Sequence, residues 1–253
     1  MADTTIELGS LLPGSDGSYE VDGRRVAMPV EVRRARMANA TFLVPADAAQ
    51  SVIAQTGLRV DRRRGGKAVV ALALIDYLDN DLGDYDEFAL SFVVQNPPGT
   101  PALGRGAVAT YIHRLPVSQP FTCEAGRGIW GFPKWVAGLR VDVGDGEATA
   151  VLRNDDGGEL LSIRLRRGII PAPSRPLTMA CYSNGPDGRI LRTSWITRTA
   201  SPRLRFGGGG AEVLVGEGHP LADELRALGF PRKCLMTMFA ASMSATFEAP
   251  VPL

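Results

Sequence analysis

Residues 139–165 read LRVDVGDGEATAVLRNDDGGELLSIRL, three short apolar-rich runs separated by two breaks rich in glycine and aspartate. Apolar residues that recur at every second position are typical of a strand with one buried face. The breaks, at 144–146 and 155–158, have the composition of hairpin turns. This stretch therefore predicts three antiparallel strands, at 139–143, 148–153 and 160–165.

Strand-like runs continue on both sides of this meander. Residues 69–75 are apolar throughout, as expected for a strand that is covered on both faces. Further candidate strands lie at 88–94, 107–112, 189–198, 212–215 and 236–247.

Helical signals are few. Residues 45–54 begin with a proline and end near Gly57, and residues 221–228 follow Pro220 and end at Gly229. No internal repeat or low-complexity linker divides the chain. We therefore predict one domain over residues 1–253 of a mainly β (α+β) class: a closed β-barrel with an accessory antiparallel sheet and two or three short helices.

The composition excludes some classes of function. The chain has 253 residues, 22% of them charged, and a net charge of +1. Because proteins that bind nucleic acids usually carry a clear basic excess, we expect no nucleic-acid partner. We expect a homo-oligomer, because the net charge is low and the hydrophobicity is moderate.

Cysteine and histidine usage gives no sign of a disulfide framework or a metal site. The three cysteines, at positions 123, 181 and 234, are odd in number and widely spaced, and the two histidines are far apart in sequence. Residues 1–10 lack the features of a signal peptide, and the apolar run 68–75 is too short to cross a bilayer. We expect a cytoplasmic protein with no membrane partner, no metal and no cofactor.

Lysine is rare in this chain, which narrows the choice of a reactive amine. Of 28 basic residues only Lys67, Lys134 and Lys233 are lysine. Lys134 lies in Gly126-Arg127-Gly128-Ile129-Trp130-Gly131-Phe132-Pro133-Lys134-Trp135, an unusually aromatic setting. Burial there would favour the neutral amine that attacks a ketone to form an imine. The alternative is a charged lysine that lies over an aromatic surface and reaches solvent.

This segment resembles the Schiff-base lysine segment of the acetoacetate decarboxylase superfamily. Gly-Arg, four residues and then Phe-Pro-Lys is the shared pattern, and Lys134 takes the position of the imine-forming lysine. Leu82-Gly83-Asp84-Tyr85-Asp86-Glu87 is similar to a second family segment, whose glutamate faces the lysine. Tyr19 and Arg24 match, more weakly, a segment that contributes an arginine to the active site.

The resemblance implies a role for each matched residue. Lys134 would form the imine, and Glu87 would move protons on and off the resulting enamine. Arg24 would bind the substrate carboxylate, with Trp135, Phe132 and Tyr85 as further substrate-binding residues. Arg127 is expected to brace the loop that carries the lysine.

One departure from the family pattern bears on the reaction. The decarboxylases have a second lysine directly after the first, and here that position is Trp135. A neighbouring ammonium would lower the pKa of the reactive lysine, so burial, helped by the indole, must do so instead. No second acid is evident either, because the expected strand is the apolar run 69–75.

The sequence therefore leaves several functions open. The first is a carbon–carbon lyase that acts on a small keto acid through an imine, either by decarboxylation or, as an aldolase-dehydratase, by condensing pyruvate with an aldehyde. The second is a non-catalytic β-barrel that binds an apolar metabolite. The third is a hydrolase or isomerase that uses Glu87 as a base without an imine.

Overall fold

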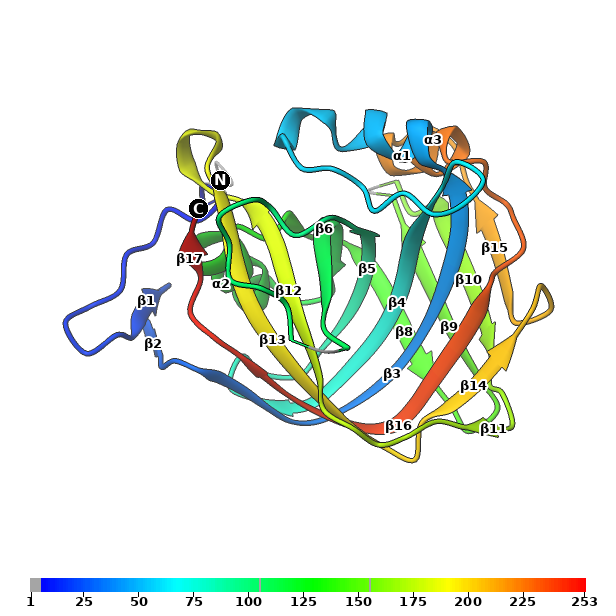
Figure 1. Cartoon of the computed structure of the whole chain (residues 1–253). Coiled ribbons are helices and arrows are strands. Elements are labelled where there is room, and N and C mark those ends of the chain that lie inside the picture. The colour runs from blue at the N-terminus through cyan, green and yellow to red at the C-terminus, as the bar shows by residue number, and fades with distance from the viewer. Residues whose placement is uncertain (1–5, 105, 155) are drawn as a thin grey trace.

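Seven of the described strands close into a barrel (Figure 1). The computed structural model describes residues 6–104, 106–154 and 156–253. The strand order around the barrel is β16-β3-β4-β5-β6-β12-β13, and β13 pairs back onto β16. All neighbours are antiparallel except β6 and β12. Their bounds are β3 Val30–Pro45, β4 Lys67–Asn80, β5 Tyr85–Val93, β6 Val108–Val117, β12 Leu177–Asn184, β13 Ile190–Ala200 and β16 Met236–Phe247.

A second antiparallel sheet packs against the outside of the barrel, where β8 contacts β4 and β5. Its order is β15-β10-β9-β8, with β8 Gly138–Val143, β9 Glu147–Arg153, β10 Glu159–Arg166 and β15 Ala211–Val215. The prediction of a meander over residues 139–165 is confirmed, as is that of a barrel with an accessory sheet. Residue 155 of the second predicted turn and residues 1–5 of the N-terminal stretch lie outside the described residues.

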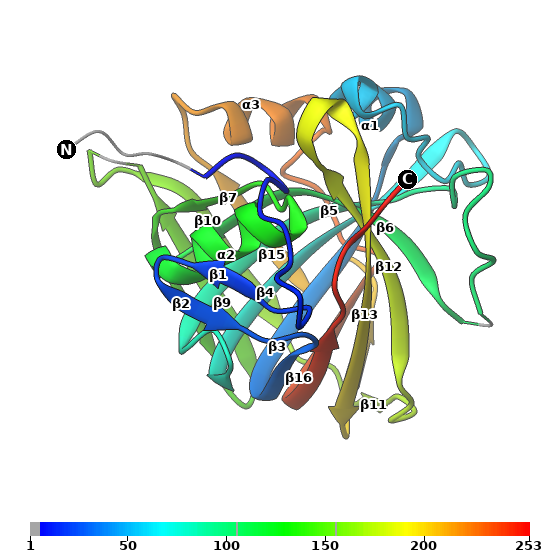
Figure 2. The same ribbon diagram turned by 90° about the vertical axis from the view of Figure 1, so that its left-hand side faces the viewer.

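The helices are short, and two of them were predicted. α1 Ala46–Val52, extended by the 3₁₀ turn η1 Ala54–Thr56, and α3 Pro220–Ala227 lie at one end of the barrel (Figures 1 and 2). α2 Pro120–Trp130 lies at the side of the barrel, next to the hairpin of β1 Tyr19–Val21 and β2 Arg24–Val26. The remaining elements are η2 Pro186–Gly188, β7 Lys134–Val136, β11 Ile170–Pro171, β14 Arg203–Phe206 and β17 Val251–Pro252.

The apolar run on β4 faces two environments. Val70, Leu72 and Leu74 are fully buried in the core between the barrel and the second sheet. Ala71 and Ala73 alternate with them and line a cavity inside the barrel. A strand that needs apolar residues on both faces shows no period of two, which explains its continuous apolar sequence.

Helix α2 and two barrel strands, β3 and β12, were missed from the sequence. We read the segment around Gly126 and Gly128 as a loop, and this was wrong, because these glycines lie inside α2. The helix begins where Gln119 Oε1 accepts from Thr122 N at 2.7 Å and ends at Gly131, whose φ of 65° is left-handed. In β3, exposed arginines near the start and a register shift beside Arg34 interrupt the alternation. Within the described residues, no helix has the length and apolar character needed to cross a lipid bilayer.

Candidate active site

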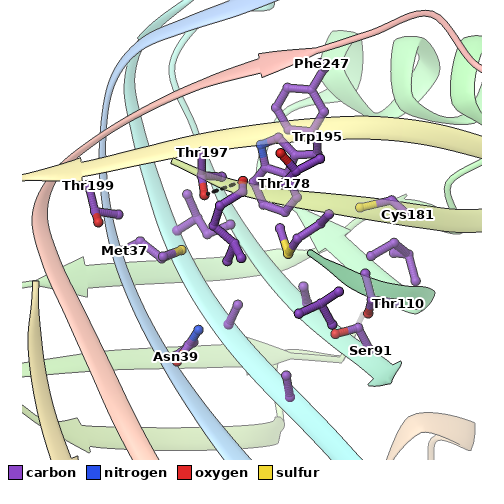
Figure 3. A pocket seen from close by; sticks show the side chains of 18 of the residues that line it. Met37, Asn39, Ser91, Thr110, Thr178, Cys181, Trp195, Thr197, Thr199 and Phe247 are labelled. Carbon is purple, nitrogen blue, oxygen red and sulfur yellow. Dashed lines mark hydrogen bonds between the residues drawn. The ribbon is translucent and has the colours of Figure 1, made fainter. Parts of the chain in front are cut away.

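The interior of the barrel is a cavity of about 970 Å³. Inward-facing residues of the barrel strands and of the segment 130–134 line it, and Figure 3 shows part of this lining. Its charged residues within the described part of the chain are Glu87, Lys134 and Arg175. Arg175 is exposed, whereas Glu87 and Lys134 are 5% and 4% exposed.

Lys134 reaches the cavity because of the short strand that carries it. β7 pairs in parallel with β6, and Leu115 is the partner of Lys134. The side chain passes over α2 at Gly126, where an added Cβ would lie 2.5 Å from Lys134 Cδ. Arg127 donates from its guanidinium to Ile6 O and to Lys134 O, both at 2.9 Å. Gly126 therefore makes room for the lysine, and Arg127 fixes the backbone beside it, from a helix rather than from the predicted loop.

Lys134 and Glu87 form a buried ion pair. Lys134 Nζ lies 2.8 Å from Glu87 Oε2 and donates to Thr122 Oγ1 at 3.2 Å. The other carboxylate oxygen, Glu87 Oε1, lies 3.3 Å from the hydroxyl of Tyr77. The ring of Tyr85 is 4.9 Å from Lys134 Nζ and stacks on the ring of Tyr77. Burial raises the pKa of both tyrosines, so Tyr77 is the donor in its contact with Glu87.

The pKa of Lys134 departs from the sequence-based expectation. Burial lowers this pKa, but the carboxylate of Glu87 raises it, and the net direction is upward from the ordinary lysine value. The expectation that burial leaves Lys134 neutral is therefore wrong for this geometry, because the desolvated ammonium lies against a desolvated carboxylate.

The turn before Glu87 links it to α2. Asn80 Oδ1 accepts from Leu82 N at 2.8 Å, and Gly83 has a φ of 96°, which favours glycine. Gln119 Nε2 donates to Leu82 O at 3.1 Å, and the same side chain caps α2. One amide thus holds the strand that carries Glu87 against the helix that packs under Lys134.

The structure brings four of the six predicted site residues together. Lys134, Glu87, Tyr85 and Phe132 all line the cavity. Phe132 is 5% exposed and stacks on Trp130.

Trp135 and Arg24 lie elsewhere. Trp135 follows Lys134 on a strand, so its side chain points away from the cavity, where it stacks on His219. The idea that this indole buries the reactive amine is wrong, and Tyr85, Thr122 and α2 cover it instead. Arg24 is exposed on β2, and its guanidinium lies 3.7 Å from the centre of the Phe121 ring. Neither residue is among those that line the cavity.

Tyr77 and Thr122 are functional candidates that the sequence reading missed. Tyr77 lies two residues beyond Ile75 on β4, so a period of two would have placed it on the cavity side. Thr122 could not be placed without recognising α2. Within the described residues, no three histidine, cysteine or acidic side chains gather as a metal site would require.

The chain is similar to a known protein family and to several solved structures. The family model described as acetoacetate decarboxylase (ADC) matches residues 19–176. No curated protein sequence matches the chain.

Solved structures with the same fold include two decarboxylase structures and a biosynthetic enzyme. The acetoacetate decarboxylase from Legionella pneumophila subsp. pneumophila str. Philadelphia 1 has a TM-score of 0.62 at 15% identity, covering 98% of each chain. A second acetoacetate decarboxylase structure has a TM-score of 0.61 at 14% identity, covering 90% of each chain. The enduracididine biosynthesis enzyme MppR complexed with pyruvate has a TM-score of 0.64 at 15% identity, covering 88% of this chain and 90% of that one.

Proposed function

Because the chain belongs to the acetoacetate decarboxylase family, we propose that it is a carbon–carbon lyase in which Lys134 forms an imine with the ketone of a small keto acid. The buried pair of Lys134 Nζ and Glu87 Oε2, 2.8 Å apart at a cavity, carries this proposal. Such a pair is a weak contributor to stability, since both charges lose their hydration. A pair of this kind at a cavity is better explained by chemistry.

The first step is a proton transfer within the pair. Lys134 gives a proton to Glu87, which replaces two buried charges by a neutral amine and a carboxylic acid. The amine attacks the ketone carbon, the ketone oxygen takes protons and leaves as water, and a protonated imine remains. Tyr77 and Thr122 hold the carboxylate and the amine in place through their hydrogen bonds.

The protonated imine then accepts electrons from a breaking bond. In the decarboxylation of a β-keto acid the bond to the carboxylate breaks, carbon dioxide leaves and an enamine forms. Glu87, which takes up a proton from solvent, gives it to the enamine carbon, and water attacks the resulting imine to release the product ketone and the free lysine. In the aldolase-dehydratase alternative an enamine formed by loss of an α-proton attacks an aldehyde, and the adduct then loses water.

Two observations favour the second branch over decarboxylation of acetoacetate. Trp135 stands where the family resemblance implies a second lysine, so the chain departs from the decarboxylase pattern at this position. MppR, whose fold is similar, has been solved with the condensation product of pyruvate and imidazole 4-carboxaldehyde. Carbon dioxide release from acetoacetate and a dehydrated condensation product from pyruvate plus aldehyde are the measurements that separate the branches.

Borohydride trapping tests the imine itself. The protein is incubated with pyruvate or acetoacetate and reduced, and peptides are analysed by mass spectrometry. We expect the adduct on Lys134, with Lys67 and Lys233 as controls within the same chain. Lys134→Arg should abolish both the adduct and turnover. If every keto acid leaves Lys134 unmodified, the imine mechanism is wrong.

The raised pKa of Lys134 gives one reason to keep a second candidate, a non-catalytic barrel that binds an apolar metabolite. In that case Lys134 stays protonated and no carbonyl is trapped. A base mechanism that uses Glu87 alone is the third candidate. It predicts that Lys134→Arg keeps substantial activity, whereas the imine mechanism predicts none.

A further inference from the structure

The cavity continues far beyond the Lys134–Glu87 pair. Strand pairing aligns inward residues in rows across β3, β4 and β5. Met37, Ile75 and Glu87 form the first row, and Asn39, Ala73 and Ala89 form the second. Thr41, Ala71 and Ser91 form the third. Because strands rise about 3.4 Å per residue, the third row, four residues along each strand, lies about 14 Å from the row of Glu87.

Small side chains keep this length open. The middle row has two alanines, and Ala71 follows in the third row. Larger residues at these positions would fill the barrel, as side chains do in small closed barrels. A cavity of about 970 Å³ lies near the upper end of the range of about 300–1,000 Å³ for sites that enclose drug-sized ligands. A three- or four-carbon keto acid would occupy only the end at Lys134.

Neutral polar groups gather away from the ion pair. Asn39, Thr41, Ser91 and Thr110 line the cavity from β3, β5 and β6, as Figure 3 shows for Asn39, Ser91 and Thr110. Asn39 Oδ1 and Thr41 Oγ1 are buried and have no hydrogen-bond partner among the described residues. Buried polar atoms rarely stay unpaired, so a ligand group or a bound water is expected to pair with them.

We propose that the carbonyl substrate is elongated, with an apolar chain that runs along Ala73 and Ala71 and a neutral hydrogen-bonding group that meets Asn39 and Thr41. Met236 and Met238 flank these residues on β16 and give the chain an adaptable apolar wall. None of the described residues in the far rows is a cation, and Arg175, which also lines the cavity, is exposed. This favours a hydroxyl or amide over a buried carboxylate. The inference rests on the proposed function for its reacting end, and on the cavity alone for its length.

The test compares carbonyl compounds of different length on one protein. Pyruvate, α-ketohexanoate, α-ketododecanoate and the ω-hydroxy and ω-carboxy forms of α-ketododecanoate are trapped on Lys134 by borohydride over a range of concentrations. We expect the concentration that gives half-maximal trapping to fall as the substrate chain lengthens. The ω-hydroxy compound should bind at least about tenfold more tightly than the ω-carboxy compound, because a buried carboxylate would have no cation to pair with.

Ala71→Leu fills the third row without touching the pair. It should raise the half-saturating concentration of α-ketododecanoate at least about tenfold more than that of pyruvate. Ala54→Leu, at an exposed position in η1, is the matched control and should change neither. Asn39→Leu should remove the preference for the ω-hydroxy compound. The melting temperature of each variant shows whether it is folded.

Displacement of the fluorescent apolar dye anilinonaphthalenesulfonate measures binding without an imine. If pyruvate is trapped but chain length and Ala71→Leu have no effect, the elongated substrate is wrong and the proposed function stands. If nothing is trapped on Lys134 but α-ketododecanoate displaces the dye in an Ala71→Leu-sensitive manner, the cavity inference stands and the imine mechanism fails. If neither occurs, both are overturned.

Discussion

Gly126 and Lys134 are in such close contact that an added Cβ on Gly126 would lie 2.5 Å from Lys134 Cδ and 2.7 Å from its Cε. The glycine lies inside α2, where it lowers helix stability by about 1 kcal/mol relative to alanine. Because the contact is with the stem of the Lys134 side chain, we interpret Gly126 as a residue that lowers helix stability but leaves room for the lysine.

The first prediction concerns Gly126→Ala. The new methyl group should move the lysine stem and lengthen the contact of Lys134 with Glu87, so the rate of imine trapping should fall about tenfold or more. The gain in helix propensity offsets part of the strain, so the melting temperature should change little. Gly146→Ala is the control, because an added Cβ there meets nothing within 4 Å. Normal trapping by Gly126→Ala would show that the contact does not position the amine.

A second prediction separates the two effects on the pKa of Lys134. Burial lowers this pKa, and the Glu87 carboxylate raises it. Glu87→Gln keeps the shape but removes the charge, so burial dominates and the pKa of Lys134 should fall below the ordinary lysine value. The pH profile of borohydride trapping should then shift to lower pH. Turnover should fall by about 100-fold or more, because the amide cannot carry the proton.

The informative outcome for Glu87→Gln is a trapping profile that shifts to lower pH while turnover is lost. A residue with a merely structural role would lower trapping and turnover together and leave the pH profile unshifted. Glu147→Gln, an exposed acid on β9, provides the comparison.

The third prediction concerns how α3 is held against the barrel. Glu224 on α3 accepts hydrogen bonds from Arg114 and lies 2.9 Å from His113 Nε2. Burial raises the pKa of Glu224, but the hydrogen bonds from His113 and Arg114 lower it by more. The net result is a pKa of about 2. This carboxylate therefore adds stability above its ordinary pKa of 4.5, and that stability is lost as the pH falls toward 2.

Glu224→Gln should accordingly lower the free energy of unfolding by about 1–3 kcal/mol at neutral pH. The difference from the unmodified protein should shrink as the pH falls from about 4.5 to about 2. Urea unfolding at several pH values measures this. An equal loss at every pH would mean that the pairing charge of Glu224 is not the cause.

The sequence allowed the accessory meander, the closed barrel and the Lys134–Glu87 pair to be predicted. The meander has the simple period of two that one buried face produces, and the pair followed from spaced motifs rather than from local chemistry. β3 was not predicted because its cavity face carries the polar residues Asn39 and Thr41, where a filled core would have apolar ones. α2 was not predicted because it contains glycines, which disfavour helices but allow close packing here.

Side-chain direction near Lys134 was the harder problem. Trp135 was expected to bury the amine, but on a strand neighbouring side chains point to opposite faces. That error follows from treating 126–135 as a loop, in which no alternation constrains the two residues. Tyr77 was missed because the predicted strand ended at residue 75, whereas β4 continues to Asn80.

The last prediction uses that direction. Trp135→Lys restores the lysine pair that the family resemblance implies, yet the new ammonium would lie beside His219, outside the cavity. It should leave the pH profile of trapping on Lys134 unchanged and lower the free energy of unfolding by about 1–3 kcal/mol, because the stacked indole is lost. Trp135→Phe keeps an aromatic ring against His219 and should lose less. If Trp135→Lys instead shifts the trapping profile to lower pH, the two side chains share one site, and a second ammonium tunes Lys134 by repulsion.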